Sequence, residues 1–341
     1  MEKRITKKKI RKKIRKRIVN PSVEVEYSSI NILTGSDLSR RRLPFMFVKS
    51  VNPGPVIWLT ACVHGDEVGG MVVIQEIFKK LKKGILKGEV YAFPLMNPMG
   101  FETGSHTIIV RSEITPVTED LNRSFPGNKD GSLAERIAFL IFTQIKETNP
   151  FLVLDLHNDW KKSIPYVLLD PNPGKDGDYE KAKEFAKKIG FPVVLDTVEV
   201  EKTLTYNLLK EGIPALAVEL GESYAVNEKD VEHGVGAIWN LLSELGMVKP
   251  DEEPLKVVIS ERIKNKILTY SQQQASLTSG VIRFLVKPGE IVNKGQPLAR
   301  IYNPFGKLME TVKALEEGIV LGYADSAVAF PGSPVMAFGN I

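Results

Sequence analysis

The sequence predicts an α/β protein, with a mixed, largely parallel sheet covered by helices on both faces and a small all-β domain after it. Over residues 21–250, short continuous apolar runs alternate with longer segments of helical periodicity, as in parallel sheets whose strands are buried on both faces. Residues 251–341 show no long helical pattern. Short alternating segments are punctuated there by Pro-Gly, Lys-Gly and Gly-Tyr pairs, which is typical of a small sandwich or barrel.

Six apolar runs are the predicted strands of the main sheet, and four periodic segments are its predicted helices. The strands are 55–63, 88–97, 151–157, 164–170, 191–196 and 213–221. The helices are 70–84, 132–147, 178–190 and 229–246. Several helices end in glycine with lysine nearby, as helix C-termini do. Because ligands of such sheets bind beyond the carboxyl ends of the strands, functional residues are expected there.

Charge is divided unevenly along the 341 residues. The net charge is +5, but residues 1–20 hold seven Lys, four Arg and one Glu, or +10, which leaves −5 for residues 21–341. No apolar stretch follows these charges, so the arm is not expected to be a secretory signal. Isoleucines at positions 10, 14 and 18 would give a basic helix that contacts nucleic acid or an anionic membrane. We favour the alternative, a flexible solvated arm, because runs of like charge are usually solvated.

The single cysteine, Cys62, excludes an intrachain disulfide and suits a reducing compartment, so a cytoplasmic location is expected. No apolar run approaches the ~20 residues that span a bilayer. The composition, 43% hydrophobic and 26% charged, is ordinary for a globular protein. The chain is long enough for one large domain and one smaller domain, each with its own core.

A stretch with metal-ligand character, TACVHGDEVGGM, lies at residues 60–71, where the first strand of the predicted main sheet ends. It contains His64 and Glu67, and a distant His157 ends another apolar strand. Imidazole nitrogen and carboxylate oxygen are zinc ligands, and three such ligands leave a fourth, catalytic position open. Each residue alone would fit a surface position or a hydrogen-bonded core position. Together, two strand-end histidines and one carboxylate favour a metal site.

The remaining residues of this stretch have supporting roles in our interpretation. Gly69 and Gly70 let the following helix begin close to the site. Asp66 is expected to face solvent or to cap that helix. The other two histidines, His106 and His233, lack a strand-end setting and are expected to be structural or solvent-exposed.

Two further segments place polar side chains where they could bind a substrate or transfer a proton. The segment EDLNRSFPG, residues 119–127, holds Asn122 and Arg123 in a turn-rich stretch. Its arginine could bind a carboxylate through two parallel hydrogen bonds, or it could form a surface ion pair. Glu219 lies inside the apolar run IPALAVELGE, where burial would raise its pKa and suit it to act as a general base. It could instead pair with a buried cation, and Glu222 is its rival as the base.

Four motifs, in order, resemble the succinylglutamate desuccinylase/aspartoacylase family, which is related in fold to the zinc carboxypeptidases. They are HGDE at 64–67, DLNRSFPG at 120–127, DLH at 155–157 and VELG at 218–221. The resemblance covers about residues 25–245 and implies a mixed sheet with flanking helices and one zinc ion (Zn2+) per chain. Residues 251–341 resemble the small β-domain that closes many members of the family.

The resemblance implies the roles of four residues at the centre of the site. His64, Glu67 and His157 match the zinc ligands of the family. Glu219 matches the glutamate that handles the proton of the attacking water. Of the alternatives weighed above, the resemblance therefore favours a metal site with a general base beside it.

Other residues match the family's substrate-binding and supporting positions. Asn122 and Arg123 match the pair that grips a substrate carboxylate, and Asp120 matches a carboxylate that orients a ligand histidine. Arg111 is the candidate for an arginine that polarises the scissile carbonyl, although it lies about one residue further from DLNR than the family spacing. Asn158 departs from the threonine or serine that often follows DLH, which could alter the pocket.

The implied activity is zinc-dependent hydrolysis of the amide bond of a small N-acyl amino acid or a similar carboxylate-bearing amide. A zinc carboxypeptidase that acts on a peptide is the alternative enzyme, and an inactive binding protein with the same fold is the alternative of another class. The predicted organisation is a basic arm (1–20), a zinc hydrolase domain (21–250) and a small β-domain (251–341). The last also resembles biotinyl and lipoyl carriers but has no Met-Lys-Met hairpin, so no attached cofactor is expected. A homo-oligomer is left open.

Overall fold

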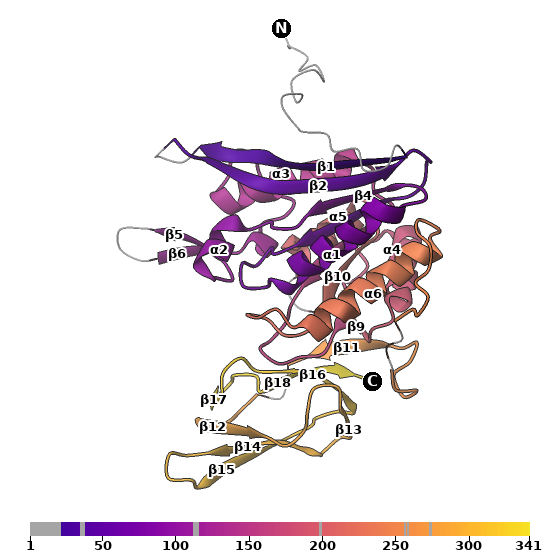
Figure 1. The fold of residues 1–341 in the computed structure, drawn as a ribbon. Coiled ribbons are helices and arrows are strands. Elements are labelled where there is room, and N and C mark those ends of the chain that lie inside the picture. Colours follow the sequence, from indigo (N-terminus) through magenta and orange to yellow (C-terminus); the bar gives the residue numbers. More distant parts are fainter. Residues whose placement is uncertain are drawn as a thin grey trace.

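The structure, a computed structural model, describes residues 22–34, 38–111, 116–197, 200–255, 257, 259–272 and 275–341. An α/β body carries a smaller group of strands from the C-terminal part of the chain at one end (Figure 1). The basic arm, residues 1–20, lies outside the described residues, so what the sequence predicts for it stays a prediction. Within the described ranges, no helix has both the length and the apolar character needed to cross a membrane.

A mixed sheet of twelve strands forms the centre of the protein, in the order β1-β2-β4-β3-β7-β10-β8-β9-β11-β18-β16-β13. The strands are β1 (Val23–Thr34), β2 (Arg40–Ser50), β3 (Val56–Ala61), β4 (Glu89–Phe93), β7 (Leu152–His157), β8 (Tyr166–Leu169), β9 (Val193–Leu195), β10 (Ala215–Glu219), β11 (Ile267–Ser271), β13 (Ile291–Val292), β16 (Gly318–Tyr323) and β18 (Met336–Asn340). From β4 through β3 and β7 to β10, neighbouring strands are parallel. Strand β8 is antiparallel to β10, and β9 is parallel to both β8 and β11. The predicted mixed, largely parallel sheet is confirmed.

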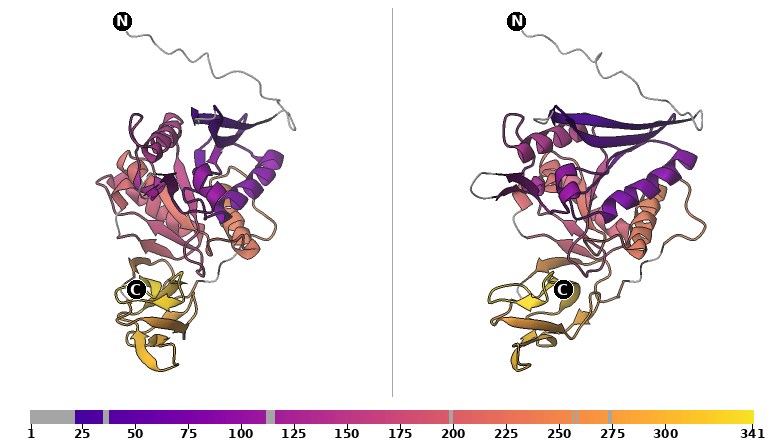
Figure 2. Two further views of the ribbon diagram at one scale, coloured as in Figure 1. Left: turned by 90° about the vertical axis from the view of Figure 1, so that its left-hand side faces the viewer. Right: turned by 60° about the vertical axis from the view of Figure 1, so that its left-hand side comes forward.

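Helices cover both faces of this sheet. They are α1 (Gly69–Gly84), α2 (Pro98–Thr103), α3 (Leu133–Glu147), α4 (Asp176–Ile189), α5 (Leu204–Lys210) and α6 (Glu228–Glu244). Helices α1 and α6 lie together on one side of the sheet, and α3 and α5 lie on the other (Figure 2). The sequence sets these positions locally: α1 buries Val73, Ile74 and Ile77 at helical spacing, and Ser132 begins α3 with a capping box.

The apolar-run pattern identifies the inner strands and the longer helices, but not the edge of the sheet. All six predicted strands and all four predicted helices are present, as β3, β4, β7, β8, β9, β10, α1, α3, α4 and α6. The pattern misses β1, in which exposed and half-buried residues alternate. It also misses β2, whose buried residues Leu43, Met46 and Val48 are separated by exposed or half-buried ones. It also misses the short hairpin of β5 (Ile108–Arg111) and β6 (Pro116–Glu119).

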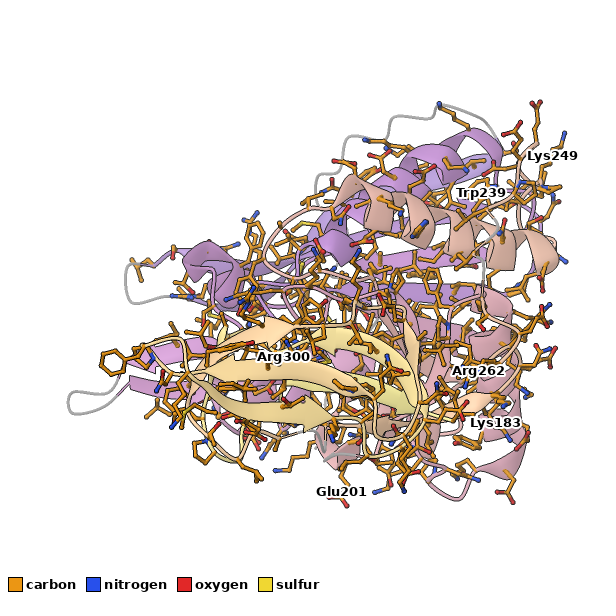
Figure 3. All side chains as sticks on the ribbon, turned by 90° about the horizontal axis from the view of Figure 1, so that it is seen from below. Lys183, Glu201, Trp239, Lys249, Arg262 and Arg300 are labelled. Atoms are coloured by element: carbon orange, nitrogen blue, oxygen red, sulfur yellow. The ribbon has the colours of Figure 1, made fainter. Side chains whose placement is uncertain are left out.

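The C-terminal part of the chain is divided between two sheets. Strands β12 (Gly280–Phe284), β14 (Pro297–Tyr302), β15 (Leu308–Lys313) and β17 (Val328–Ala329) form a separate antiparallel sheet. Figure 3 shows this sheet from below, with the exposed Arg300 on β14. The other C-terminal strands, β11, β18, β16 and β13, extend the main sheet beyond β9. The sheet therefore continues across residue 250, and a division into domains 21–250 and 251–341 stays a prediction.

The order of the central strands places three chain segments side by side. Strands β3, β7 and β10 are consecutive and parallel, and Glu219 at the end of β10 is the register partner of His157 at the end of β7. Strand β3 ends at Ala61, and the β3–α1 loop (residues 62–68) follows it. The carboxyl ends of three neighbouring strands therefore converge at one edge, where ligands of such sheets bind.

Candidate metal and catalytic site

The β3–α1 loop is held tightly by glycines. A side chain on Gly65 would place its Cβ 2.0 Å from the carbonyl carbon of Gly100, and the Gly65 amide donates a hydrogen bond to the Ser105 carbonyl at 3.1 Å. At the start of α1, a Cβ on Gly69 would lie 2.8 Å from the Asn158 amide group, and one on Gly70 would lie 2.8 Å from Leu156. Only glycine permits these approaches, so α1 begins directly against the end of β7, as predicted.

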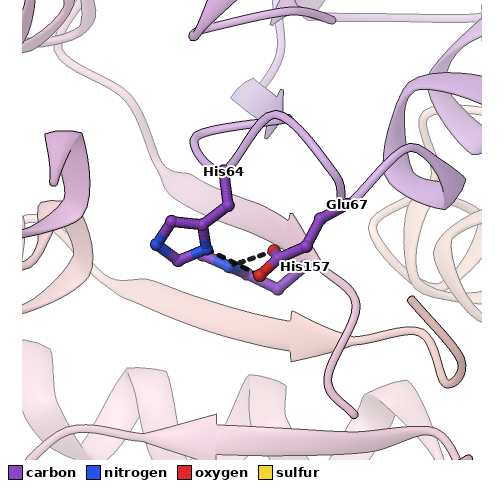
Figure 4. Close-up of side chains that lie close together, drawn as sticks. All are labelled: His64, Glu67 and His157. Carbon is purple, nitrogen blue, oxygen red and sulfur yellow. Dashed lines mark hydrogen bonds and ion pairs between the residues drawn. The ribbon is translucent and has the colours of Figure 1, made fainter. Parts of the chain in front are cut away.

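Three buried side chains meet at this edge of the sheet (Figure 4). The Glu67 carboxylate lies between two imidazoles: its Oε1 is 2.6 Å from His64 Nδ1, and its Oε2 is 2.9 Å from His157 Nδ1. The potential ligand atoms of the three residues all lie within 4.8 Å of one another. Both histidines therefore present the same ring nitrogen to the same carboxylate, which is a donor arrangement that a single metal ion can use.

The opposite ring nitrogens of both histidines face carboxylates as well. His157 Nε2 lies 3.0 Å from Asp155 Oδ2, and His64 Nε2 lies 3.5 Å from Asp120 Oδ1. Asp155 is itself anchored, because its Oδ1 accepts a hydrogen bond from the Thr60 hydroxyl at 2.7 Å. Such carboxylate partners orient metal-binding histidines. Sequence reasoning selected Asp120 and missed Asp155, although the period of two along β7 puts Asp155 and His157 on the same face.

The electrostatics are those of a carboxylate between two basic imidazoles. Burial alone would lower the pKa of His64, but the carboxylates of Glu67 and Asp120 raise it to about 9. Burial also opposes protonation of His157, yet Asp155 and Glu67 raise its pKa well above the usual value. Burial alone would raise the pKa of Glu67, and the two histidines lower it below its usual range. A metal that binds here must displace protons from the imidazoles.

Glu219 lies beside this group, at the end of β10. Its side chain is buried, and its Oε2 has no hydrogen-bond partner among the described residues. Burial raises the pKa of Glu219 well above the ordinary value, as the sequence predicts. The rival carboxylate, Glu222, instead accepts a hydrogen bond from the Asn227 side-chain amide at 3.4 Å. Of the two glutamates, Glu219 is the one with a buried oxygen left to serve a ligand.

The DLNR motif forms a short 3-10 helix, residues Leu121–Arg123, next to the histidines. Asn122 is buried, and its Oδ1 accepts a hydrogen bond from the Leu204 amide at 3.2 Å. Arg123 is exposed. Burial alone would raise the pKa of Asp120, but its hydrogen bond to His64 and the nearby Arg123 charge lower it. Arg111 ends β5, and its side chain lies outside the described part of the structure.

The expectation for one neighbouring residue needs correction. Asp66 neither faces solvent nor caps α1: it is 6% exposed, and the N-cap residue of α1 is Val68, with no side-chain cap hydrogen bond. Its Oδ1 lies 3.1 Å from Nδ1 of His106, whose ring stacks on that of His64 with centroids 3.7 Å apart. His106 is half exposed, yet it belongs to the surroundings of the site. The packing of the loop at Gly65 brings His106 to the site, and no local sequence pattern predicts that packing.

Comparison with known proteins places this chain in a family. The sequence profile of the succinylglutamate desuccinylase/aspartoacylase catalytic domain matches residues 53–245, more than half of the chain. The chain belongs to the succinylglutamate desuccinylase/aspartoacylase family. Its predicted membership is confirmed, and the matched range contains all three strands that converge on the site.

Individual proteins are similar to this chain in sequence or fold. The N-alpha-acetyl-L-2,4-diaminobutyric acid deacetylase of Halomonas elongata is 30% identical over 277 residues, which cover 76% of this chain and 74% of the relative. The product-bound ectoine utilization protein EutE of Ruegeria pomeroyi superposes with a TM-score of 0.75 at 22% identity, over 94% of this chain and 95% of that chain. A succinylglutamate desuccinylase/aspartoacylase of Rhodobacter sphaeroides gives a TM-score of 0.74 at 20% identity, over 93% and 95%. The family's named enzymes are deacylases, which is consistent with amide hydrolysis by this member.

Proposed function

We propose that the protein is a zinc-dependent amidohydrolase that removes the acyl group from a small N-acyl amino acid or a similar carboxylate-bearing amide. The observation that carries the proposal is the buried set of two imidazole nitrogens and one carboxylate, with the unpaired oxygen of Glu219 beside it. Relatives that are named as a deacetylase and a desuccinylase support the reaction class.

The donor set fits zinc. Two histidines and one glutamate are the protein ligands of several catalytic zinc sites, and His64, Glu67 and His157 would hold the ion here. When bound, a zinc ion supplies a Lewis acid that polarises a carbonyl group and lowers the pKa of water toward ~7. Asp155 and Asp120 would accept hydrogen bonds from the outer nitrogens of the two imidazoles and so keep Nδ1 of each ring free as a ligand.

Glu219 is the proposed general base and acid. Its unpaired Oε2 would take the proton of the attacking water and then deliver it to the nitrogen of the leaving amine as the C–N bond breaks. The products are a carboxylic acid and an amine. A carboxyl group whose pKa is raised by burial is suited to both transfers, because it takes up a proton more readily than an exposed carboxylate does.

Arg123 is the proposed group that recognises the substrate carboxylate. Its side chain is exposed, and its charge acts on Asp120, which in turn contacts His64, so Arg123 lies on the side of the site where a substrate carboxylate could be bound. With Asn122 Oδ1 engaged by the Leu204 amide, the side-chain NH₂ of Asn122 is the group left to donate to a ligand. Arg111 remains the proposed residue for polarising the scissile carbonyl.

A substrate screen tests the proposed class. The purified protein, supplied with zinc, is incubated with N-alpha-acetyl-L-2,4-diaminobutyrate, N-succinylglutamate, a series of N-acetyl amino acids and a set of peptides with free C-termini. Each N-acyl amino acid is paired with its carboxamide, which lacks the carboxylate. We expect release of free amine from at least one N-acyl amino acid and much less from its carboxamide. Hydrolysis of peptides alone would favour the carboxypeptidase alternative, and no hydrolysis of any compound would contradict the proposal.

A further inference from the structure

His106 and Asp66 lie beside the proposed zinc ligands but have no role in the proposed reaction. Among the described residues, two more sets of three potential metal ligands lie within 4.8 Å of one another, and both include His106. One set is Asp66, Glu67 and His106; the other is His64, His106 and Asp120. The half-exposed His106 is therefore a potential ligand on the solvent side of the buried group.

The first of these sets has the closer geometry. His106 Nδ1 lies 3.1 Å from Asp66 Oδ1 and 3.8 Å from Glu67 Oε1. The side chain of Asp66 is 4% exposed and that of His106 is 50% exposed. The exposed imidazole of His106 thus faces two buried carboxylates. An ion could approach from the solvent side and exchange its bound water molecules for these ligands.

The backbone fixes these residues in place. The Gly65 amide donates to the carbonyls of Ser105 and His106, at 3.1 and 3.4 Å, which ties the β3–α1 loop to the segment that carries His106. The Tyr224 amide donates to the Asp66 carbonyl at 3.2 Å. The His106 ring is held as well, stacked on His64 at an interplanar angle of 15°. Ligands that are positioned before an ion arrives lose little conformational freedom when it binds.

We propose that Asp66, Glu67 and His106 form a second site for a divalent cation of the zinc type, next to the first site and sharing Glu67 with it. One imidazole and two carboxylates suit Zn²⁺ or Co²⁺, and a carboxylate has two oxygens with which to serve two neighbouring ions. This site binds its ion more weakly than the first site does, because it shares Glu67 with the first site and has only Asp66 and His106 as ligands of its own. It lies beyond the one-metal reaction proposed above.

The simpler role for these residues is a hydrogen bond between Asp66 and His106 that supports the loop. The two roles make different predictions. A purely structural pair takes up no ion, so metal uptake would not depend on either residue. A metal site loses its ion when either ligand is removed, even by a change that keeps the fold.

Metal titration of the full-length protein separates these roles. Protein as purified is dialysed against increasing concentrations of Zn²⁺ alone, and the bound metal per chain is measured by mass spectrometry. We expect the wild type to rise from about one to about two ions per chain. His106→Ala and Asp66→Asn should both stop at the first ion, whereas His233→Ala, which alters a histidine on α6 outside all three sets, should follow the wild type.

A reciprocal variant keeps this proposal distinct from the proposed function. His157→Ala should lose the first ion and keep the uptake that depends on His106, because Asp66, Glu67 and His106 remain. Asp66→Asn replaces one carboxylate oxygen with an NH₂ group and keeps the shape of the side chain, so it decides the question if His106→Ala fails to fold. The second site is contradicted if the wild type never exceeds one ion, or if His106→Ala and Asp66→Asn both bind as much metal as the wild type. Absence of an ion that depends on His157 would instead contradict the proposed function.

Discussion

Strand β7 and the β3–α1 loop each bring a histidine to the site, and they hold it in different ways. His157 is the last residue of a strand that is buried along its whole length, and its partner Asp155, 3.0 Å away, has a side chain that is 1% exposed. His64 lies in the loop, and its partner Asp120, 3.5 Å away, has a side chain that is 27% exposed. The carboxylate behind His157 is therefore closer to its imidazole and less exposed to solvent than the carboxylate behind His64.

This difference identifies the rigid and the adjustable half of the site. A short hydrogen bond between buried groups fixes the orientation and tautomer of an imidazole more firmly than a long, partly solvated contact. We therefore interpret the β7 side as the fixed side of the proposed metal site. On the loop side the backbone is held by glycines, but the His64 imidazole is less firmly held and is the part that can adjust to the ion and substrate. Removing the carboxylate behind the histidine should therefore weaken zinc binding more on the β7 side than on the loop side.

The largest effect is expected from removing a proposed ligand itself. His157→Ala should abolish tightly bound zinc and, with it, hydrolysis, because two ligands cannot replace a three-ligand catalytic site. His233→Ala should retain the wild-type zinc content in the same metal analysis. Full zinc retention in a His64→Ala, His157→Ala double variant would refute the ligand set on both sides of the comparison.

The second-largest effect is expected from replacing Glu219, the residue proposed to transfer the proton in place of either histidine. Glu219→Gln should leave zinc binding intact and lower kcat by ~10²–10⁴-fold, as expected for loss of a general base. The rival residue provides the matched control, so Glu222→Gln should have little effect on kcat. Steady-state kinetics on the best substrate from the screen measures both. Near-wild-type kcat in Glu219→Gln would show that Glu219 is not the base.

A smaller effect is expected from altering the carboxylates behind the two histidines. Asp155→Asn should weaken zinc binding by ~10–100-fold, the usual cost of losing a carboxylate behind a ligand histidine. Asp120→Asn should weaken it less, because its contact with His64 is longer and partly solvated. The measurement is zinc affinity by competition with a chelator of known strength. An effect of Asp120→Asn that equals or exceeds that of Asp155→Asn would contradict the distinction between a fixed and an adjustable side.

The smallest effect is expected at the exposed Arg123. Arg123→Lys keeps the charge but loses the planar fork that grips a carboxylate, so it should raise KM by about tenfold or less with little change in kcat. Arg136→Lys, at another exposed arginine, should change neither constant. Carboxamide substrates should be insensitive to both variants. If Arg123→Lys impairs the carboxamide as much as the acid, Arg123 is structural and does not bind the substrate carboxylate.

The central part of the fold and the proposed ligand set follow from sequence because each depends on short-range patterns. Strands β3, β7 and β10 are continuous apolar runs, and parallel strands direct the residues at their carboxyl ends to one edge. His64, His157 and Glu219 all lie at or just after such an end. The proximity of His157 and Glu219 could be predicted from their strands alone, and that of His64 from its place shortly after the end of β3.

Residues that meet through loop packing could not be predicted in this way. His106 reaches His64 and Asp66 because Gly65 packs against Gly100, an approach between segments that no periodic pattern encodes. Asp155 is a different case, since the strand period was sufficient to identify it. The continuation of the main sheet into β11, β18, β16 and β13 was also unpredictable, because pairing between distant strands depends on the assembled fold.

The most direct test of the account is removal and restoration of the metal. Zinc is removed from the purified protein with a chelator, and hydrolysis of the best N-acyl amino acid is measured before removal, after removal and after adding back one equivalent of zinc. Activity should be lost with the metal and regained with that equivalent, and His157→Ala should regain none. Undiminished hydrolysis by protein shown to be free of metal would contradict zinc dependence.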